Sequence, residues 1–118
     1  MSPYGVPRLQ VVNMQARDLQ GQAARFVQAH GLDASPEVRL LDLVSEVGEA
    51  AKEVLRSADC GRVPFRPARG WEGELGDALF GRVCLANTTG VDLEARFEDA
   101  LKECESRLEA RGDAGSAG

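Results

Sequence analysis

The sequence has few of the residues that build zinc sites or disulfide frameworks. It contains one His, one Tyr and one Trp among 118 residues, and its three cysteines, Cys60, Cys84 and Cys104, form no CxxC pair. Neither a zinc centre nor a disulfide framework is therefore indicated. A di-iron bundle of ferritin type needs Glu-x-x-His on two helices, which the single His30 excludes. Cys84 and Cys104 fall on apolar helical faces and are predicted to be small core residues.

Long apolar runs and clusters of positive charge are also missing. No segment approaches the roughly 20 apolar residues of a membrane span, and residues 1–10 lack the apolar core of a signal peptide. The net charge is −5, from 19 acidic and 14 basic residues. That balance argues against a nucleic acid polymer as the partner, because such binding needs clustered Lys and Arg. The sequence predicts a cytoplasmic protein that binds no membrane and no nucleic acid polymer.

Helical periodicity fills most of the chain, and sustained period-2 alternation is absent. Apolar residues three and four apart predict helices over about 7–30, 36–58, 71–88 and 93–111. Gly31 and Gly90 are the expected C-terminal stops. Ser35 and Asp92 are the expected N-caps. A loop rich in Pro and Gly separates the second and third patterns.

These patterns predict an all-α fold, a four-helix bundle-like domain over residues 1–111, followed by a disordered tail over 112–118. A domain of this size buries a limited share of its surface, so we expect copies to self-associate. Apolar stripes on three of the helices are expected to face the core. They are Leu9, Val12, Ala16, Leu19, Ala23 and Phe26 in the first helix, Leu40, Val44, Val47, Ala51, Val54 or Leu55, and Ala58 in the second, and Leu93, Phe97, Leu101, Cys104 and Leu108 in the fourth.

Carboxylates gather on one face of the second predicted helix. On a helical wheel, Asp42, Glu46, Glu49 and Glu53 share a strip about 60° wide that contains no cation. Two interpretations are open at this point. The strip is either a solvated face, as most acidic runs on helices are, or a set of ligands whose cation offsets the repulsion of like charges at i,i+3 and i,i+4.

The third predicted helix favours the second interpretation. Over residues 75–89 the only charged residues are Asp77 and Arg82, and apolar side chains cover nearly every side. A helix that is apolar all round is expected to be buried. Glu74 and Asp77 would then project from a buried helix without a basic residue at i±4, and an unpaired buried carboxylate is costly. A divalent cation would supply the missing charge.

The spacing of the acids agrees with a shared cation. Glu46 and Glu49 are three residues apart, as are Glu74 and Asp77, so each pair lies on one helical face. Two helices facing each other would present all four carboxylates to one point. Ligation by carboxylate oxygens alone suits Mg²⁺ or Mn²⁺.

Glycines interrupt both helices at Gly48, Gly73, Gly76 and Gly81. Each glycine inside a helix costs about 1 kcal/mol relative to Ala. Two reasons for accepting that cost are open here: a ligand approaches the backbone, or the helices pack closely.

The segments "EVGEAAKEV" and "ELGDALFGRVCLANTTGVDLEARFEDAL" resemble the MazG-like, all-α nucleoside triphosphate pyrophosphohydrolases, a group that includes the dimeric dUTPases and the dCTP pyrophosphatases. The pattern of that family is EExxE, a spacer and ExxD. Glu46 and Glu49 match the last two acids of the first half, and Glu74 and Asp77 match the second half. The similarity runs over about residues 35–110. Ser45 replaces the first acid, so another group would have to activate the water if that acid does so in the family.

This resemblance implies Mg²⁺-dependent cleavage of a (d)NTP between its α- and β-phosphates, which yields a (d)NMP and pyrophosphate. It implies a role in sanitising the nucleotide pool, with Mn²⁺ as a substitute metal. The implied metal ligands are Glu46, Glu49, Glu74 and Asp77, and Glu46 or Glu49 would also orient the attacking water. The resemblance favours a homotetramer over a dimer.

Residues outside this set are candidates for substrate binding, each with a plainer alternative. Lys52 and Arg69 could meet phosphates or be solvated. One of Trp71, Phe65 and Phe80 could stack on a base, and core packing is the alternative for Phe80. Asn87 matches an Asn that contacts the nucleotide in the family, or it could cap the helix before Gly90. Two rival functions remain open: a non-catalytic helical module that binds nucleotides or proteins, and a family member that has lost turnover.

Overall fold

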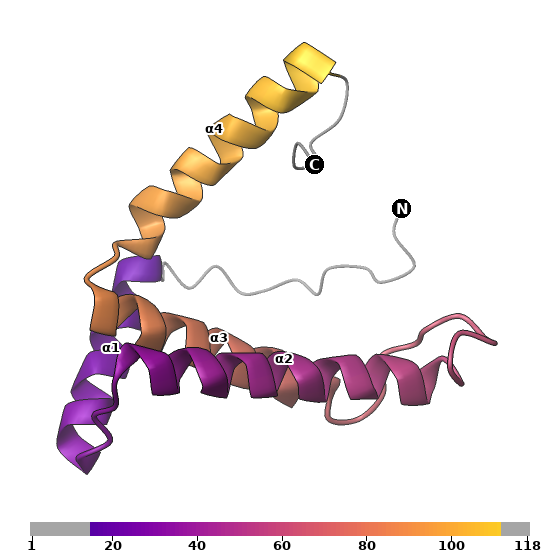
Figure 1. Ribbon diagram of the computed structural model, residues 1–118, viewed down its shortest axis with the longest axis horizontal. Coiled ribbons are helices and arrows are strands. Elements are labelled where there is room, and N and C mark those ends of the chain that lie inside the picture. Colours follow the sequence, from indigo (N-terminus) through magenta and orange to yellow (C-terminus); the bar gives the residue numbers. More distant parts are fainter. Residues whose placement is uncertain (1–14, 112–118) are drawn as a thin grey trace.

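The computed structural model describes residues 15–111 of the chain. This part forms four helices and no strand: α1 (Ala16–His30), α2 (Pro36–Ser57), α3 (Trp71–Thr89) and α4 (Leu93–Arg111) (Figure 1). The predicted all-α fold is confirmed. The prediction of one helix from about residue 7 to His30 was wrong at its start. Gln15 is extended, with φ of −95° and ψ of 162°, and forms a capping box with Asp18, so α1 begins at Ala16. The predicted core residues Leu9 and Val12 and the predicted disordered tail over 112–118 lie outside the described residues. Within them, no helix combines the length and apolar character needed to cross a membrane.

The helix ends form at the residues that the sequence indicates. Ser35 Oγ accepts a hydrogen bond from the N–H of Val38 at 3.3 Å, and Pro36 is the first residue of α2. Gly31 and Gly90 adopt the left-handed conformation, with φ of 64° and 70°, and end α1 and α3. This conformation is strained for residues with a side chain, which explains glycine at both positions.

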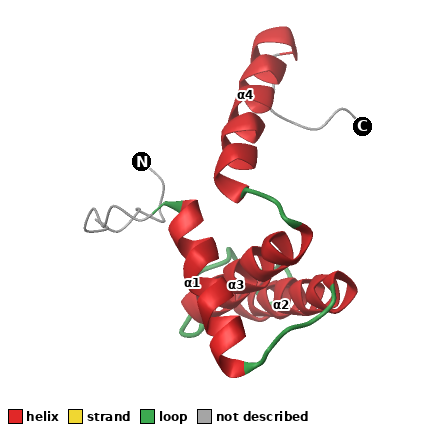
Figure 2. Ribbon diagram, turned by 90° about the vertical axis from the view of Figure 1, so that its left-hand side faces the viewer, coloured by secondary structure: helices red, strands yellow, loops and turns green. Residues whose placement is uncertain are grey.

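Helices α2 and α3 form an antiparallel pair, and α1 packs against α3 (Figure 2). An added Cβ on Gly81 of α3 would lie 3.6 Å from Cα of Leu43 in α2, so the two backbones approach closely there. The core that joins α1 to α3 consists of buried Ala23, Val83 and Cys84. The prediction that Cys84 is a core residue is confirmed, whereas Cys104 on α4 is only half-buried.

Several predicted core residues are exposed in the single chain. Leu43 is the buried apolar residue of α2, while the predicted stripe is about half exposed, with Leu40 at 50%, Val44 at 60% and Val47 at 49%. The prediction of the buried face was therefore wrong for α2. Helix α2 carries apolar residues on two sides. The side with Leu43 is the buried one, because Gly81 of α3 approaches α2 closely there.

Two other helices expose apolar side chains for a related reason. Helix α3 is covered by α1 and α2 on part of its surface, which leaves Leu75, Leu79 and Phe80 between 42% and 50% exposed. Helix α4 extends away from the other three and makes its main contacts with α1 (Figure 1). Its apolar residues Phe97 and Leu101 are consequently exposed. The sequence predicted that these five side chains are buried. Within one chain they are exposed.

Asp92 joins the start of α4 to α1. Its Oδ1 accepts hydrogen bonds from the N–H groups of Glu94 and Ala95, at 3.1 and 3.3 Å, and its Oδ2 lies 3.0 Å from the guanidinium of Arg17. The predicted N-cap is thus present. The hydrogen bond from Arg17, followed by that from the Ala95 N–H, lowers the pKa of Asp92 below its usual value.

We expect Asp92→Ala to lower Tm by a few degrees at pH 7, because the variant loses the cap and the link to Arg17. A carboxylate whose folded pKa is depressed stabilises the fold above about pH 4 and loses this effect as the pH falls through the folded pKa. Thermal melts followed by circular dichroism from pH 7 to strong acid should therefore show the difference from wild type narrowing at the acid end. Asp99→Ala serves as the control. A difference that stayed constant with pH would contradict this account.

Candidate metal centre

Three carboxylates from two helices converge on one point. Glu46 comes from α2, and Glu74 and Asp77 come from adjacent turns of α3. One oxygen of each carboxylate lies within 4.8 Å of one oxygen of each of the others. Glu46 and Glu74 are half-buried and Asp77 is exposed. The antiparallel pairing of α2 with α3 is what places Glu46 opposite the other two.

The fourth predicted ligand, Glu49, lies beside this group of three carboxylates. It forms a long ion pair with Lys52, at 3.8 Å, and its side chain is 51% exposed. Glu53, one turn further along α2, pairs with Arg56 at 3.2 Å. The structure thus brings three of the four predicted ligands together and leaves Glu49 at the edge.

The carboxylates of this group repel one another, and the repulsion affects the pKa of Glu74. Removal from water raises the pKa of Glu74, and the negative charges of Glu49, Asp77 and Glu46 raise it further. Within residues 15–111, no Lys or Arg forms an ion pair with Glu46, Glu74 or Asp77. These carboxylate oxygens lie close together and have no Lys or Arg partner in this part of the chain. Such a set of oxygen ligands fits a hard divalent ion such as Mg²⁺.

Comparison with known proteins shows which family the chain belongs to. Residues 34–113 match the family described as the MazG nucleotide pyrophosphohydrolase domain. The chain belongs to the MazG family. "Uncharacterized protein YpjD" of Bacillus subtilis (strain 168) is 30% identical over 93 residues, which cover 77% of this chain and 84% of that protein. No solved structure matches the chain.

The MazG match includes α2, α3 and α4, and so the three converging carboxylates together with Ser45. Ser45 is exposed on α2, next to Glu46 in sequence. No acid therefore stands where the family pattern has its first Glu. Glu49 is the remaining acid of α2 within the pattern.

Two of the other predicted substrate-binding residues of the MazG domain have partners within the chain. Lys52 pairs with Glu49. The ring of Trp71 packs edge-on against Phe65, with centroids 5.1 Å apart. Arg69 is exposed in the loop before α3.

Asn87 is held by α1. Its Nδ2 donates to the carbonyl oxygen of Gln20 at 3.0 Å, and its Oδ1 accepts from Nε2 of Gln20 at 3.1 Å. It lies ten residues beyond Asp77, about 15 Å along α3. The structure therefore does not bring Asn87 to the acids, and its side chain links two helices instead of capping α3.

The four glycines inside α2 and α3 divide into two groups. Gly81 meets Leu43, as close helix packing requires. An added Cβ at Gly48, Gly73 or Gly76 would have no heavy atom within 4 Å. Within the described part of the chain, packing explains the first glycine, and the other three leave room for another molecule.

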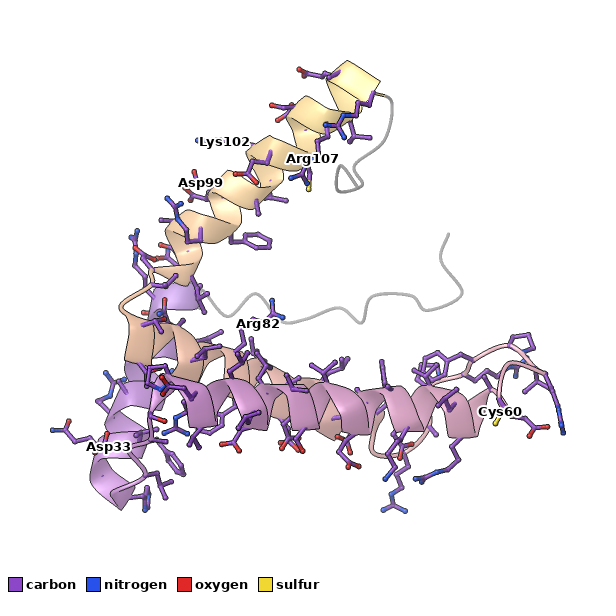
Figure 3. All side chains as sticks on the ribbon, in the orientation of Figure 1. Asp33, Cys60, Arg82, Asp99, Lys102 and Arg107 are labelled. Atoms are coloured by element: carbon purple, nitrogen blue, oxygen red, sulfur yellow. The ribbon has the colours of Figure 1, made fainter. Side chains whose placement is uncertain are left out.

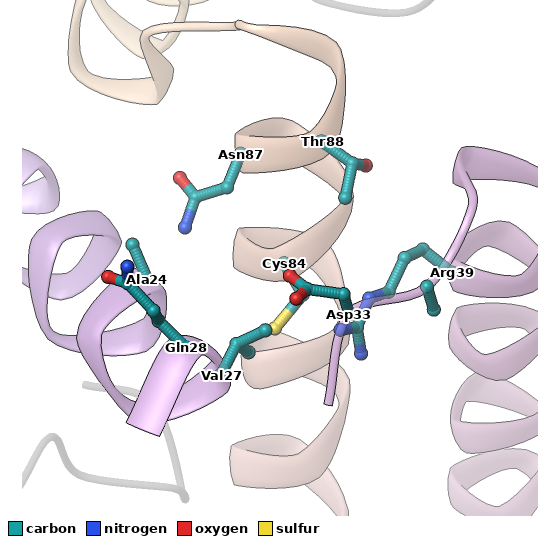
Figure 4. A pocket seen from close by; sticks show the side chains of 9 residues that line it. Ala24, Val27, Gln28, Asp33, Arg39, Cys84, Asn87 and Thr88 are labelled. Atoms are coloured by element: carbon teal, nitrogen blue, oxygen red, sulfur yellow. The ribbon is translucent and has the colours of Figure 1, made fainter. Parts of the chain in front are cut away.

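Sequence reasoning missed a cleft near the start of α2, where Asp33, Arg39 and Cys84 line one side (Figure 4). Arg39 interrupts the apolar beginning of α2 and lies seven residues before Glu46. Seven residues are nearly two full turns, so both side chains project from the same face of the helix. That spacing places Arg39 on the helical face of Glu46, but the cleft itself forms only where α1 and the connection after it pack against α2 and α3.

Proposed function

We propose that the chain is a Mg²⁺-dependent nucleoside triphosphate pyrophosphohydrolase that converts a (d)NTP into a (d)NMP and pyrophosphate. Mn²⁺ is the expected substitute for Mg²⁺. The observation that carries this proposal is the convergence of Glu46, Glu74 and Asp77, whose oxygens lie within 4.8 Å of one another on two helices. Membership of the MazG family supports it, because residues 34–113 match a nucleotide pyrophosphohydrolase domain.

The chemistry of the substrate requires the metal. A triphosphate would be repelled by a group of carboxylates, and bound Mg²⁺ would reverse the local charge, polarise the phosphoryl group and acidify a bound water. Glu46, Glu74 and Asp77 would hold the ion. Hydrolysis forms a bond between the water oxygen and the α-phosphorus and breaks the bond to the α–β bridging oxygen, so that pyrophosphate leaves.

Glu49 is the residue that we assign to orienting the water and accepting its proton. It lies beside the three ligands without joining them, and its ion pair with Lys52 is long and exposed. A carboxylate that would lie near the ion without ligating it suits this task. With Ser45 in place of an acid, Glu49 is the candidate that α2 retains within the family pattern.

Self-association, the cytoplasmic location and a role in sanitising the nucleotide pool belong to the same proposal. Exposed apolar residues on α2, α3 and α4 support association, since large apolar surfaces mark interaction sites. We favour a homotetramer over a dimer. Ser45 also favours a second candidate, a helical module that binds nucleotides without turning them over.

The test is an assay of pyrophosphate release from a panel of ribo- and deoxyribonucleoside triphosphates, with Mg²⁺ or with EDTA. We expect a (d)NMP and pyrophosphate as products with Mg²⁺, no turnover with EDTA, and a strong loss of turnover in Glu49→Gln. A nucleoside diphosphate and inorganic phosphate as products would mean cleavage between the β- and γ-phosphates, which would contradict the proposal. If no triphosphate were hydrolysed and Glu49→Gln matched wild type, the binding module would replace the enzyme.

A further inference from the structure

The cleft near the start of α2 has the size and chemistry of a small-molecule site. Its volume is about 390 Å³, and it lies between α1, the connection from α1 to α2, and the two paired helices (Figure 4). Small-molecule sites typically fall within this range of volumes. Cys84 and Val27 supply apolar surface. The polar groups come from Gln28 on α1, Asp33 on the connection, Arg39 on α2, and Asn87 and Thr88 on α3.

Arg39 is anchored at the cleft with part of its hydrogen-bonding capacity unused. One terminal nitrogen donates to the carbonyl oxygen of Leu32, which holds the guanidinium in place. Its Nε is buried and has no hydrogen-bond partner among the described residues, so a ligand in the cleft would contact the terminal nitrogens instead. A guanidinium offers donors only, so a group that binds there must bring an acceptor. Asp33, on the same cleft, offers acceptors when ionised.

Two residues that line the cleft lie on the helical faces that carry the acidic group. Arg39 precedes Glu46 by seven residues on α2, and Cys84 follows Asp77 by seven residues on α3. Each step of seven returns to the same helical face, about 10 Å further along. Because α2 and α3 run antiparallel, both steps lead to the same end of the pair. A nucleotide with its phosphates at the acids would extend its ribose and base toward Arg39.

We propose that this cleft holds the base of the nucleotide and that Arg39 makes it select purines with a carbonyl at C6 over purines with an amino group there. The proposal rests on the proposed function for the position of the phosphates. A 6-oxopurine presents O6 and N7 as acceptors to the guanidinium and N1–H as a donor to Asp33. A 6-aminopurine presents a donor at C6, where the guanidinium needs an acceptor.

The test compares inosine with adenosine, which differ at C6 and in the proton on N1. Binding to the metal-free full chain is followed by NMR titration with each nucleoside, so that neither metal nor turnover is needed. Wild type should bind inosine about 5- to 150-fold more tightly, the discrimination typical of a good bidentate contact to a base. In Arg39→Leu this ratio should fall to about one.

Arg82→Leu is the matched control, because Arg82 is an exposed arginine that projects from α3 on the side toward which α4 extends (Figure 3). It should retain the ratio of wild type. Arg39→Gln is the second variant if Arg39→Leu does not fold, as judged by circular dichroism, and it should also lose the preference. Equal binding of the two nucleosides, no binding at millimolar concentration, or a preference that survives in both Arg39 variants would overturn the proposal.

Kinetics separate this proposal from the proposed function. Discrimination between the nucleosides without pyrophosphate release from any triphosphate would retain the base site and reject the enzyme. Pyrophosphate release from ITP and ATP with equal kcat/KM, together with equal nucleoside binding, would retain the enzyme and reject the role of Arg39.

Discussion

Glu74→Gln and Asp77→Asn are each expected to lower kcat/KM for a nucleoside triphosphate by more than about 100-fold. Loss of an outer partner of a metal ligand already costs 10- to 100-fold in metal affinity or activity, so loss of a direct ligand should exceed that range. The amide is nearly the same size as the carboxylate, and the change removes charge without opening a cavity. The measurement is the steady-state rate of pyrophosphate release at saturating Mg²⁺.

Glu72→Gln is the matched control for this result. Glu72 lies in the first turn of α3, two residues before Glu74, and residues two apart do not share a helical face. It should keep the activity of wild type. Full activity in Glu74→Gln and Asp77→Asn would mean that the three converging carboxylates are a solvated acidic face, the interpretation that competes with the metal centre.

Mg²⁺ at about 100 times its Kd should raise Tm by roughly 10 °C. Binding to the folded chain alone contributes about 2.7 kcal/mol at that concentration, and a domain of about 100 residues gains roughly 4 °C or more per kcal/mol. Differential scanning calorimetry with Mg²⁺, and again after excess EDTA, measures the effect. Addition of NaCl to equal ionic strength controls for general screening of charge.

Glu74→Gln should change both the Tm of the metal-free chain and the rise in Tm on adding Mg²⁺. The neighbouring carboxylates raise the pKa of Glu74, so its charge is unfavourable in the folded chain without metal. Removing that charge, which partial burial disfavours before the neighbouring carboxylates do, should raise Tm in EDTA and abolish most of the gain on adding Mg²⁺. A metal-dependent rise in Tm that was equal in the variant and in wild type would place the ion elsewhere on the protein.

The helix ends followed from local signals because their hydrogen bonds close within a few residues. Ser35 caps α2 through the N–H of Val38, and Asp92 caps α4 through Glu94 and Ala95. Gly31 and Gly90 end their helices because a left-handed φ favours glycine. None of these choices depends on what packs against the helix, so the sequence predicted them correctly.

The candidate site was predictable in part. The three-residue spacing of Glu74 and Asp77 puts both on one face of α3 whatever surrounds it. Their meeting with Glu46 depends on the register between α2 and α3, which the contact of Gly81 with Leu43 sets. In that register Glu46 joins the group and Glu49 stays at its edge. Spacing along α2 alone could not show which of the two joins the group.

By itself, the sequence determined four helices, the N-caps of α2 and α4, the glycines that end α1 and α3, and the placement of the acids on helical faces. All of these arise from hydrogen bonds and periodicity over a few residues. Only the tertiary structure decided which of two apolar sides of α2 is buried, since that choice depends on contacts between helices far apart in the chain. Tertiary packing also directed α4 away from the other helices and brought Arg39 and Asp33 to one cleft with Cys84.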